Sequence, residues 1–283
     1  MRYSIGLRMH DTVPGTLRER ADFIRSQGFD CVHLALSKVI GKQMMDPGVM
    51  TPGLADAVIK DLGGLSVAVL GCYLNLAEPD ESRYLGILRK YTAHLRLSRW
   101  LNAGMVGTET GNLPEDVLRA EDEEAMDRAA DFYIERLRPA VRNAEKLGAV
   151  LAIEPVWRHS IRNGRCARRM LDAISSPNLG IILDPVNLIH PGHPERADET
   201  VQEAMDLLSD EILMVHLKDW VPDGQGQAEA VAAGTGRMNY APVFRFIREK
   251  KPGIQMTLEN TRPDNAVQAR RFVEQMLYAP EDA

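Results

Sequence analysis

The sequence has 283 residues, is 45% hydrophobic and carries a formal net charge of −6, with 34 Lys and Arg against 40 Asp and Glu. This length and apolar content allow one large core or two smaller ones, and the acidic balance argues against a general nucleic-acid-binding protein. The three cysteines form no C-x-x-C pair, residues 1–8 lack a signal-peptide core and no apolar run reaches about 18 residues, so we expect a cytoplasmic protein without a membrane partner.

Short β-rich runs alternate along the whole chain with longer stretches that have helical periodicity. The runs lie near residues 3–7, 31–36, 66–72, 103–107, 149–153, 179–183, 212–217 and 254–259. Between them, residues 14–28 and 123–148 are amphipathic stretches that each end on a glycine, as helices commonly do. The runs are continuously apolar rather than alternating, which is typical of parallel strands buried on both faces.

Eight such runs, with helical stretches between them, predict an α/β fold of the (β/α)8 TIM-barrel type, as a single domain over residues 1–283. A doubly wound open sheet is the competing layout. It is disfavoured because the first run is followed by "GLRMHDTVPG" and not by a G-x-G-x-x-G turn.

Polar side chains of metal-ligand type stand at the ends of four consecutive runs. Glu154 ends the fifth run, Asp184 the sixth and Glu259 the eighth, and His216 lies near the end of the seventh. The C-terminal strand ends of a (β/α)8 barrel form its active-site mouth, so these groups should meet at one part of the rim. Each group alone has an ordinary explanation as a helix cap, a solvated loop residue or a satisfied histidine, but the joint pattern favours a site.

Three carboxylates that converge repel one another, and a divalent cation between them removes that cost. With one neutral imidazole added, three carboxylates around a 2+ ion leave a local charge of −1. This donor set suits Mn²⁺, Mg²⁺ or Co²⁺ at least as well as Zn²⁺. We therefore predict one divalent metal ion, with Mn²⁺ as the leading choice.

Segments around these residues resemble a known family. They are "GTETGN" (107–112), "IEP" (153–155), "ILDPVN" (182–187), "VHLKD" (215–219) and "TLEN" (257–260). They are similar to segments of the sugar phosphate isomerase/epimerase superfamily, the xylose isomerase-like barrels. The resemblance implies that Glu154, Asp184, His216 and Glu259 bind one divalent metal, and that the two glutamates move protons on opposite faces of the substrate. It also implies a small sugar or keto-sugar as the partner, and a homodimer or homotetramer as the assembly to expect.

Asn187 departs from the pattern of these barrels. A histidine often stands three residues after the sixth-strand Asp, and here that position is Asn187, which can bond a hydroxyl but cannot act as an acid or base. The related endonuclease IV proteins hold three metals with additional histidines. This chain has seven histidines in all and lacks their D-x-x-H segment, so no nucleic-acid partner is expected.

The chemistry expected of this site is proton abstraction next to a carbonyl, through a metal-stabilised enediolate, with Glu154 and Glu259 as the catalytic residues. Returning the proton gives an isomerase or epimerase acting on a sugar or keto-sugar. Loss of a β-substituent instead gives a lyase or dehydratase that acts on an inosose or a 3-keto-glycoside. A sugar-binding barrel without turnover and an endonuclease IV-like enzyme are the remaining alternatives.

Other polar and aromatic residues follow the predicted strands and are candidates for substrate binding. They are Glu109, Trp157, His159, Asn187 and Lys218. A long glycine-rich segment, 221–241, is expected to be a loop before the last helix, and it could form a lid or wall over the metal. Its "GTG" triplet is a weak phosphate signal, so a phosphorylated substrate is not inferred.

Overall fold

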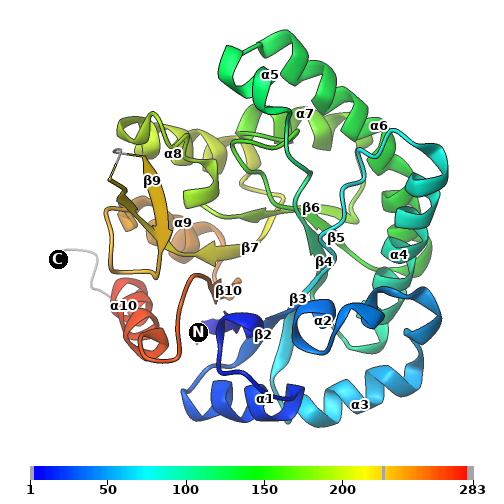
Figure 1. Cartoon of the computed structure of the whole chain (residues 1–283). Coiled ribbons are helices and arrows are strands. Elements are labelled where there is room, and N and C mark those ends of the chain that lie inside the picture. The colour runs from blue at the N-terminus through cyan, green and yellow to red at the C-terminus, as the bar shows by residue number, and fades with distance from the viewer. Residues whose placement is uncertain (1–2, 225–226, 279–283) are drawn as a thin grey trace.

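A closed barrel of eight parallel strands forms the centre of the molecule (Figure 1). The computed structural model describes residues 3–224 and 227–278. The strand order around the barrel is β1-β10-β7-β6-β5-β4-β3-β2. These strands are β1 (Ser4–Arg8), β2 (Cys31–Leu34), β3 (Ser66–Gly71), β4 (Met105–Thr108), β5 (Leu151–Ile153), β6 (Leu179–Leu183), β7 (Ile212–Leu217) and β10 (Gln255–Leu258). The (β/α)8 barrel predicted from the sequence is confirmed, and each predicted run overlaps one barrel strand.

Helices cover the outside of the barrel (Figure 1). They are α1 (Leu17–Ser26), α2 (Leu36–Val39), α3 (Pro52–Leu62), α4 (Glu81–Trp100), α5 (Glu115–Ala120), α6 (Glu123–Leu147), α7 (Gly164–Ile174), α8 (Ala197–Leu208), α9 (Ala241–Lys250) and α10 (Ala266–Tyr278). A capping box at Thr16 begins α1, and α6 ends at Gly148, whose φ of 61° is in the left-handed region that glycine tolerates best. Across the described ranges, no helix is both long and apolar enough to span a membrane.

The barrel strands are apolar on both faces because they lie between two hydrophobic layers. The outer layer is the large core formed where the strands pack on the helices. The inner layer is a separate buried cluster that consists of strand side chains: Cys31, Ala68, Val69, Met105, Ala152, Ile182 and Met214. These side chains close the interior of the barrel below its mouth, so a ligand can approach only at the ends of the strands.

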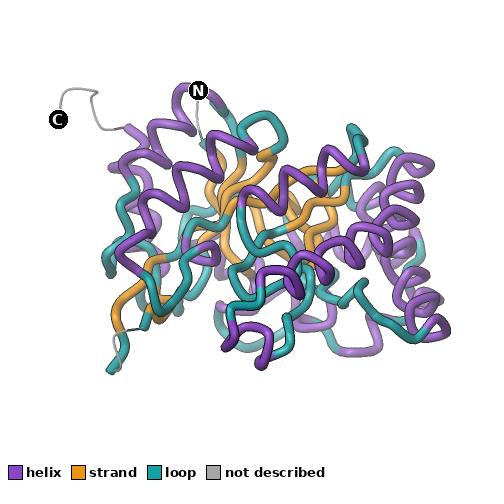
Figure 2. Tube along the Cα trace, turned by 90° about the horizontal axis from the view of Figure 1, so that it is seen from above, coloured by secondary structure: helices purple, strands orange, loops and turns teal. Residues whose placement is uncertain are grey.

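The segment 221–241 differs from the loop expected, because its first part belongs to a second small sheet. Strand β8 (Asp219–Pro222) pairs antiparallel with β9 (Ala228–Val231), and both strands stand outside the barrel (Figure 2). Residues 225–226 of this segment lie outside the described part of the chain. The alternation typical of a hairpin strand was masked in the sequence by the small residues around β9.

Asp219 holds the second half of this segment in place. Its carboxylate accepts hydrogen bonds from the backbone N–H groups of Trp220, Gly234, Gly236 and Met238, at 2.8–3.1 Å. The "GTG" turn is thus folded around a carboxylate of the chain itself, and these N–H groups are not available to a phosphate. The hydrogen bonds of Asp219 also fix the backbone next to Lys218, whose side chain points into the barrel mouth.

Candidate metal centre

The four predicted ligands gather at the mouth of the barrel. Glu154, Asp184 and Glu259 directly follow β5, β6 and β10, and His216 lies within β7. All four are buried, with at most 3% of each residue exposed. Nδ1 of His216 lies 3.3 Å from Oε2 of Glu154 and 3.3 Å from Oε1 of Glu259. Candidate ligand atoms of Glu154, Asp184 and His216 all lie within 4.8 Å of one another.

The strand register explains why these residues meet. His216 pairs with Thr257 across β7 and β10, and Leu183 pairs with Val215 across β6 and β7. Residues just beyond these pairs therefore leave the sheet at nearly the same height and point into the mouth. The chain separates Glu154 from Glu259 by more than a hundred residues, and closure of the barrel brings a carboxylate oxygen of each to 3.3 Å from the same histidine nitrogen.

The arrangement fits a divalent cation. Within the described ranges, neither ring nitrogen of His216 has a hydrogen-bond partner, although two carboxylate oxygens lie 3.3 Å from its Nδ1. A buried polar atom without a partner is costly, and such atoms commonly mark the place of an ion or a water molecule. Three carboxylates and one imidazole would hold a cation of the Mn²⁺, Mg²⁺, Co²⁺ or Zn²⁺ class.

Two basic side chains also reach this centre. Nζ of Lys218 lies 2.8 Å from Oδ2 of Asp184 and 3.3 Å from Oε2 of Glu259. Nη1 of Arg8, at the end of β1, lies 2.8 Å from the same Glu259 oxygen. Lys218 was predicted to contact substrate, and the structure places its ammonium against the carboxylates. Arg8 was not predicted, although it too ends an apolar strand in a charged residue.

The two catalytic candidates have different electrostatic surroundings. Burial and the nearby Glu259 raise the pKa of Glu154 to about 7, while Asn187 donates a hydrogen bond of 2.5 Å to its Oε1. Burial opposes the ionisation of Glu259, but its pKa is held well below the usual value by the surrounding basic groups, which are His216, Lys218, His33 and Arg8. Of these two glutamates, Glu154 is therefore the one whose protonation state can change near neutral pH.

Metal affinity should fall as the pH decreases from about 8 to 5. The pKa of Glu154 is raised to about 7, and burial raises the pKa of Asp184 to about 6. Both groups must lose their protons to bind a cation, so acid competes with the metal. Titration of the metal-free protein with Mn²⁺ by calorimetry at several pH values measures this, and the number of protons released on binding should increase as the pH falls through 7 and 6. An affinity that does not change with pH would contradict it.

A short turn after β6 orients Asp184. Its Oδ1 accepts hydrogen bonds from the backbone N–H groups of Val186 and Asn187, at 3.0 and 3.1 Å. These bonds leave its second oxygen, Oδ2, directed at the shared centre beside Lys218. The side chain of Asn187 is half-buried, and its amide N–H donates to the Glu154 carboxylate.

Replacement of Asn187 by Ala should weaken sugar binding and leave the metal in place. The Asn187 amide offers a donor and an acceptor to a hydroxyl, and losing one such bond costs roughly tenfold in affinity. Sugar titrations of the metal-loaded variant, with metal content measured on the same sample, check this. Loss of the metal together with the sugar would show that Asn187 supports the ligands instead.

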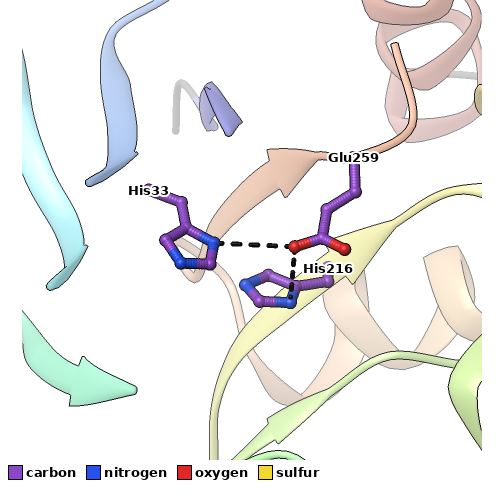
Figure 3. A group of neighbouring side chains, drawn as sticks. All are labelled: His33, His216 and Glu259. Atoms are coloured by element: carbon purple, nitrogen blue, oxygen red, sulfur yellow. Dashed lines mark ion pairs between the residues drawn. The ribbon is translucent and has the colours of Figure 1, made fainter. Parts of the chain in front are cut away.

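His33 and Tyr73 form an outer arm of the site, in which Tyr73 contacts His33 and His33 contacts Glu259. Nδ1 of His33 lies 3.5 Å from Oε1 of Glu259, and the His33 ring stacks on His216 with centroids 5.1 Å apart. Figure 3 shows that nitrogens of both histidines face the same Glu259 oxygen. The other His33 nitrogen, Nε2, lies 2.6 Å from the Tyr73 hydroxyl. A Cβ on Gly71 would lie 2.7 Å from the Tyr73 ring, so glycine leaves room for this contact.

Substitution of Tyr73 by Phe should lower metal affinity by roughly tenfold, as is typical when an outer partner of a metal site is lost. The change removes only the hydroxyl that holds His33, and His33 borders Glu259. Mn²⁺ titration followed by electron paramagnetic resonance measures it. Tyr84→Phe is a matched control, because its hydroxyl donates to the carbonyl of Arg136, outside this arm. Equal affinity in both variants would mean that the arm does not support Glu259.

Glu109 and His159 lie together at another part of the mouth. Oε2 of Glu109 is 3.7 Å from Nδ1 of His159, and burial together with Glu154 raises the pKa of Glu109 to about 7. The segment "GTETGN" after β4 is bonded to the loop after β5, through a bridge between Asn112 and His159. Trp157 lies farther out: its ring packs on His190, with centroids 4.7 Å apart.

A closed barrel with carboxylates and an imidazole gathered at its mouth is an arrangement typical of metal-dependent enzymes. The model of the xylose isomerase-like TIM barrel family matches residues 21–276, and the chain belongs to this family. Among curated proteins, none matches the sequence significantly.

Solved structures of similar fold include sugar-modifying enzymes. The chain resembles 3-keto-D-glucoside 4-epimerase YcjR from E. coli, with a TM-score of 0.73, 17% identity and coverage of 97% of this chain and 99% of that chain. It resembles the IOLI protein with a bound zinc atom (TM-score 0.73, 15% identity, coverage 97% and 98%). It also resembles the probable 3-DHS dehydratase AsbF from Bacillus anthracis (TM-score 0.71, 15% identity, coverage 99% and 100%). At these identities, the likeness shows the shared fold.

Proposed function

We propose that this protein is a divalent-metal-dependent isomerase or epimerase that moves a proton next to the carbonyl of a sugar or keto-sugar. The observation that carries the proposal is the placement of Glu154 and Glu259 beside one nitrogen of His216, with a carboxylate oxygen of each 3.3 Å from its Nδ1. The family and the sugar epimerase among the similar structures support the same class of substrate.

Glu154, Asp184, His216 and Glu259 would hold the cation, with Mn²⁺ as the leading choice and Mg²⁺, Co²⁺ or Zn²⁺ as alternatives. When bound, the cation would polarise the carbonyl and offset the negative charge that develops on its oxygen. Glu259 would take the proton from the neighbouring carbon, because the cationic groups around it keep it ionised. Glu154, whose pKa of about 7 lets it carry a proton near neutral pH, would deliver one to the substrate, while Asn187 would bond a hydroxyl. Deuterium entering at the carbon beside the carbonyl, in D₂O, tests this proposal.

A lyase or dehydratase reaction is the second candidate. The pair formed by Glu109 and His159 favours it, because the pKa of Glu109 is raised to about 7 and a protonated carboxyl there could give its proton to a departing β-hydroxyl. A structure of similar fold is described as a probable dehydratase. Product analysis by mass spectrometry distinguishes the two candidates, since elimination of water lowers the product mass and isomerisation does not change it.

A further inference from the structure

A second hollow lies on the mouth face of the barrel, outside the metal centre. It is a pocket of about 700 Å³, within the size range of small-molecule sites, between the first turns of α6, α7 and α8 and the loops after β5 and β6. In a (β/α)8 barrel these helix starts and loops belong to the face that carries the active site. The upper part of Figure 1 shows α5, α7 and α8 grouped at this side of the barrel.

The pocket and the metal centre share a wall. Trp157 and Leu188 line the pocket, and both are close in the chain to site residues. The backbone N–H of Trp157 donates to the carbonyl of Asn187 at 2.8 Å, and the Asn187 side chain bonds Glu154. The segments that carry Trp157 and Asn187 therefore lie between the pocket and the metal centre.

Each arginine that lines the pocket is paired with a carboxylate that also lines it. Arg162 contacts Glu123 and Asp127, Arg165 contacts Glu203, and Arg196 contacts Glu199, all at 3.2 Å or less. Every one of these residues lines the pocket. An anionic ligand would meet these carboxylates as well as the arginines. A neutral ligand rich in hydroxyls can bond to both kinds of group without leaving a charge unpaired.

An aromatic wall completes the pocket. His190 packs on Trp157 with centroids 4.7 Å apart and on His193 with centroids 5.1 Å apart. All three rings line the pocket, and Trp157 is half-buried while the two histidines are exposed. Aromatic faces offer flat apolar area, which the C–H face of a sugar ring can cover while its hydroxyls reach the surrounding charged groups.

We propose that this pocket binds a second sugar ring, so that the substrate is a glycoside whose reacting keto ring lies at the metal centre. The proposal rests on the proposed function for the reacting ring, but the pocket can be tested separately. Its ligand is a neutral polyhydroxylated ring, recognised by paired arginines and carboxylates around an aromatic wall.

Binding is tested first, without turnover. Saturation-transfer NMR with methyl β-D-glucopyranoside, on chelator-treated protein, should show contact in the wild type. Thr200→Trp, which fills the pocket from α8, and His190→Ala, which removes part of the aromatic wall, should abolish it. Gln202→Trp is the matched control, because Gln202 is exposed on the same helix and does not line the pocket. Absence of contact in the wild type, equal contact in Thr200→Trp, or displacement by inorganic phosphate would each overturn the proposal.

Turnover is tested second. Deuterium exchange of a 3-keto-glucoside with a glucosyl aglycone should exceed that of the methyl 3-keto-glucoside in kcat/KM by roughly 3- to 10-fold, the size of one aromatic contact. Thr200→Trp should remove this preference and leave exchange of the methyl compound unchanged. Equal rates for the two compounds in the wild type would overturn the glycoside assignment. Absence of exchange for both would reject the proposed function, and the NMR result would still decide whether the pocket binds sugar.

Discussion

Replacement of Glu154 and Glu259 together by Gln should abolish deuterium exchange at the carbon next to the substrate carbonyl. Each single replacement should slow exchange by roughly 10²–10⁴-fold, the usual loss when a general base is removed. Gln keeps an oxygen donor near the shared centre but cannot take a proton. The effect therefore separates proton transfer from metal binding, provided that metal content is measured on the same samples.

Proton NMR in D₂O, with candidate ketoses and keto-glycosides, follows this exchange. Glu249→Gln is the control, because Glu249 is an exposed residue of α9. We expect the pH dependence of exchange near neutral pH to flatten in Glu154→Gln and to persist in Glu259→Gln, since the pKa of Glu154 is about 7 and that of Glu259 is held well below its usual value. Turnover that persists in the double variant with the metal retained would mean that both carboxylates serve the metal alone.

Replacement of Asp184 by Ala should remove the bound divalent metal. Asp184 is fully buried, the turn after β6 fixes its Oδ1, and its Oδ2 lies at the shared centre beside Lys218. The loss in affinity should exceed the roughly 10–100-fold that is typical of an outer partner. Elemental analysis of the purified protein, together with Mn²⁺ titration, measures it.

Two further variants test whether a loss of metal could be caused by misfolding. Asp184→Asn keeps the shape of the side chain and should lose metal while retaining the circular dichroism spectrum of the wild type. Asp206→Ala, at an exposed position of α8, should retain both metal and spectrum. Metal content equal to that of the wild type in Asp184→Ala would show that the ligand assignment is wrong.

The sequence by itself determined the barrel and the four ligand candidates, and both follow from periodic patterns. Continuously apolar runs separated by amphipathic stretches can pack in few ways. The closed parallel barrel is one of them, because it buries every run on both faces. Glu154, Asp184, His216 and Glu259 could be found because equivalent strand ends in a parallel barrel face the same mouth. This argument requires only the position of each residue in its strand, which a single sequence contains.

Only the tertiary structure decided which other residues join them. Arg8 reaches Glu259 across 251 residues, and Tyr73 reaches it through His33, because barrel closure places β1 and β2 near β10. The hairpin after β7 depends on Asp219 accepting bonds from backbone groups as far as nineteen residues away. The direction of a side chain in a loop is set by such long-range contacts, and the hydrophobic periodicity of the local sequence does not predict it. The contact of Lys218 and Trp157 with substrate stays a prediction, but only the structure shows that Lys218 faces the carboxylates and that Trp157 lines a separate pocket.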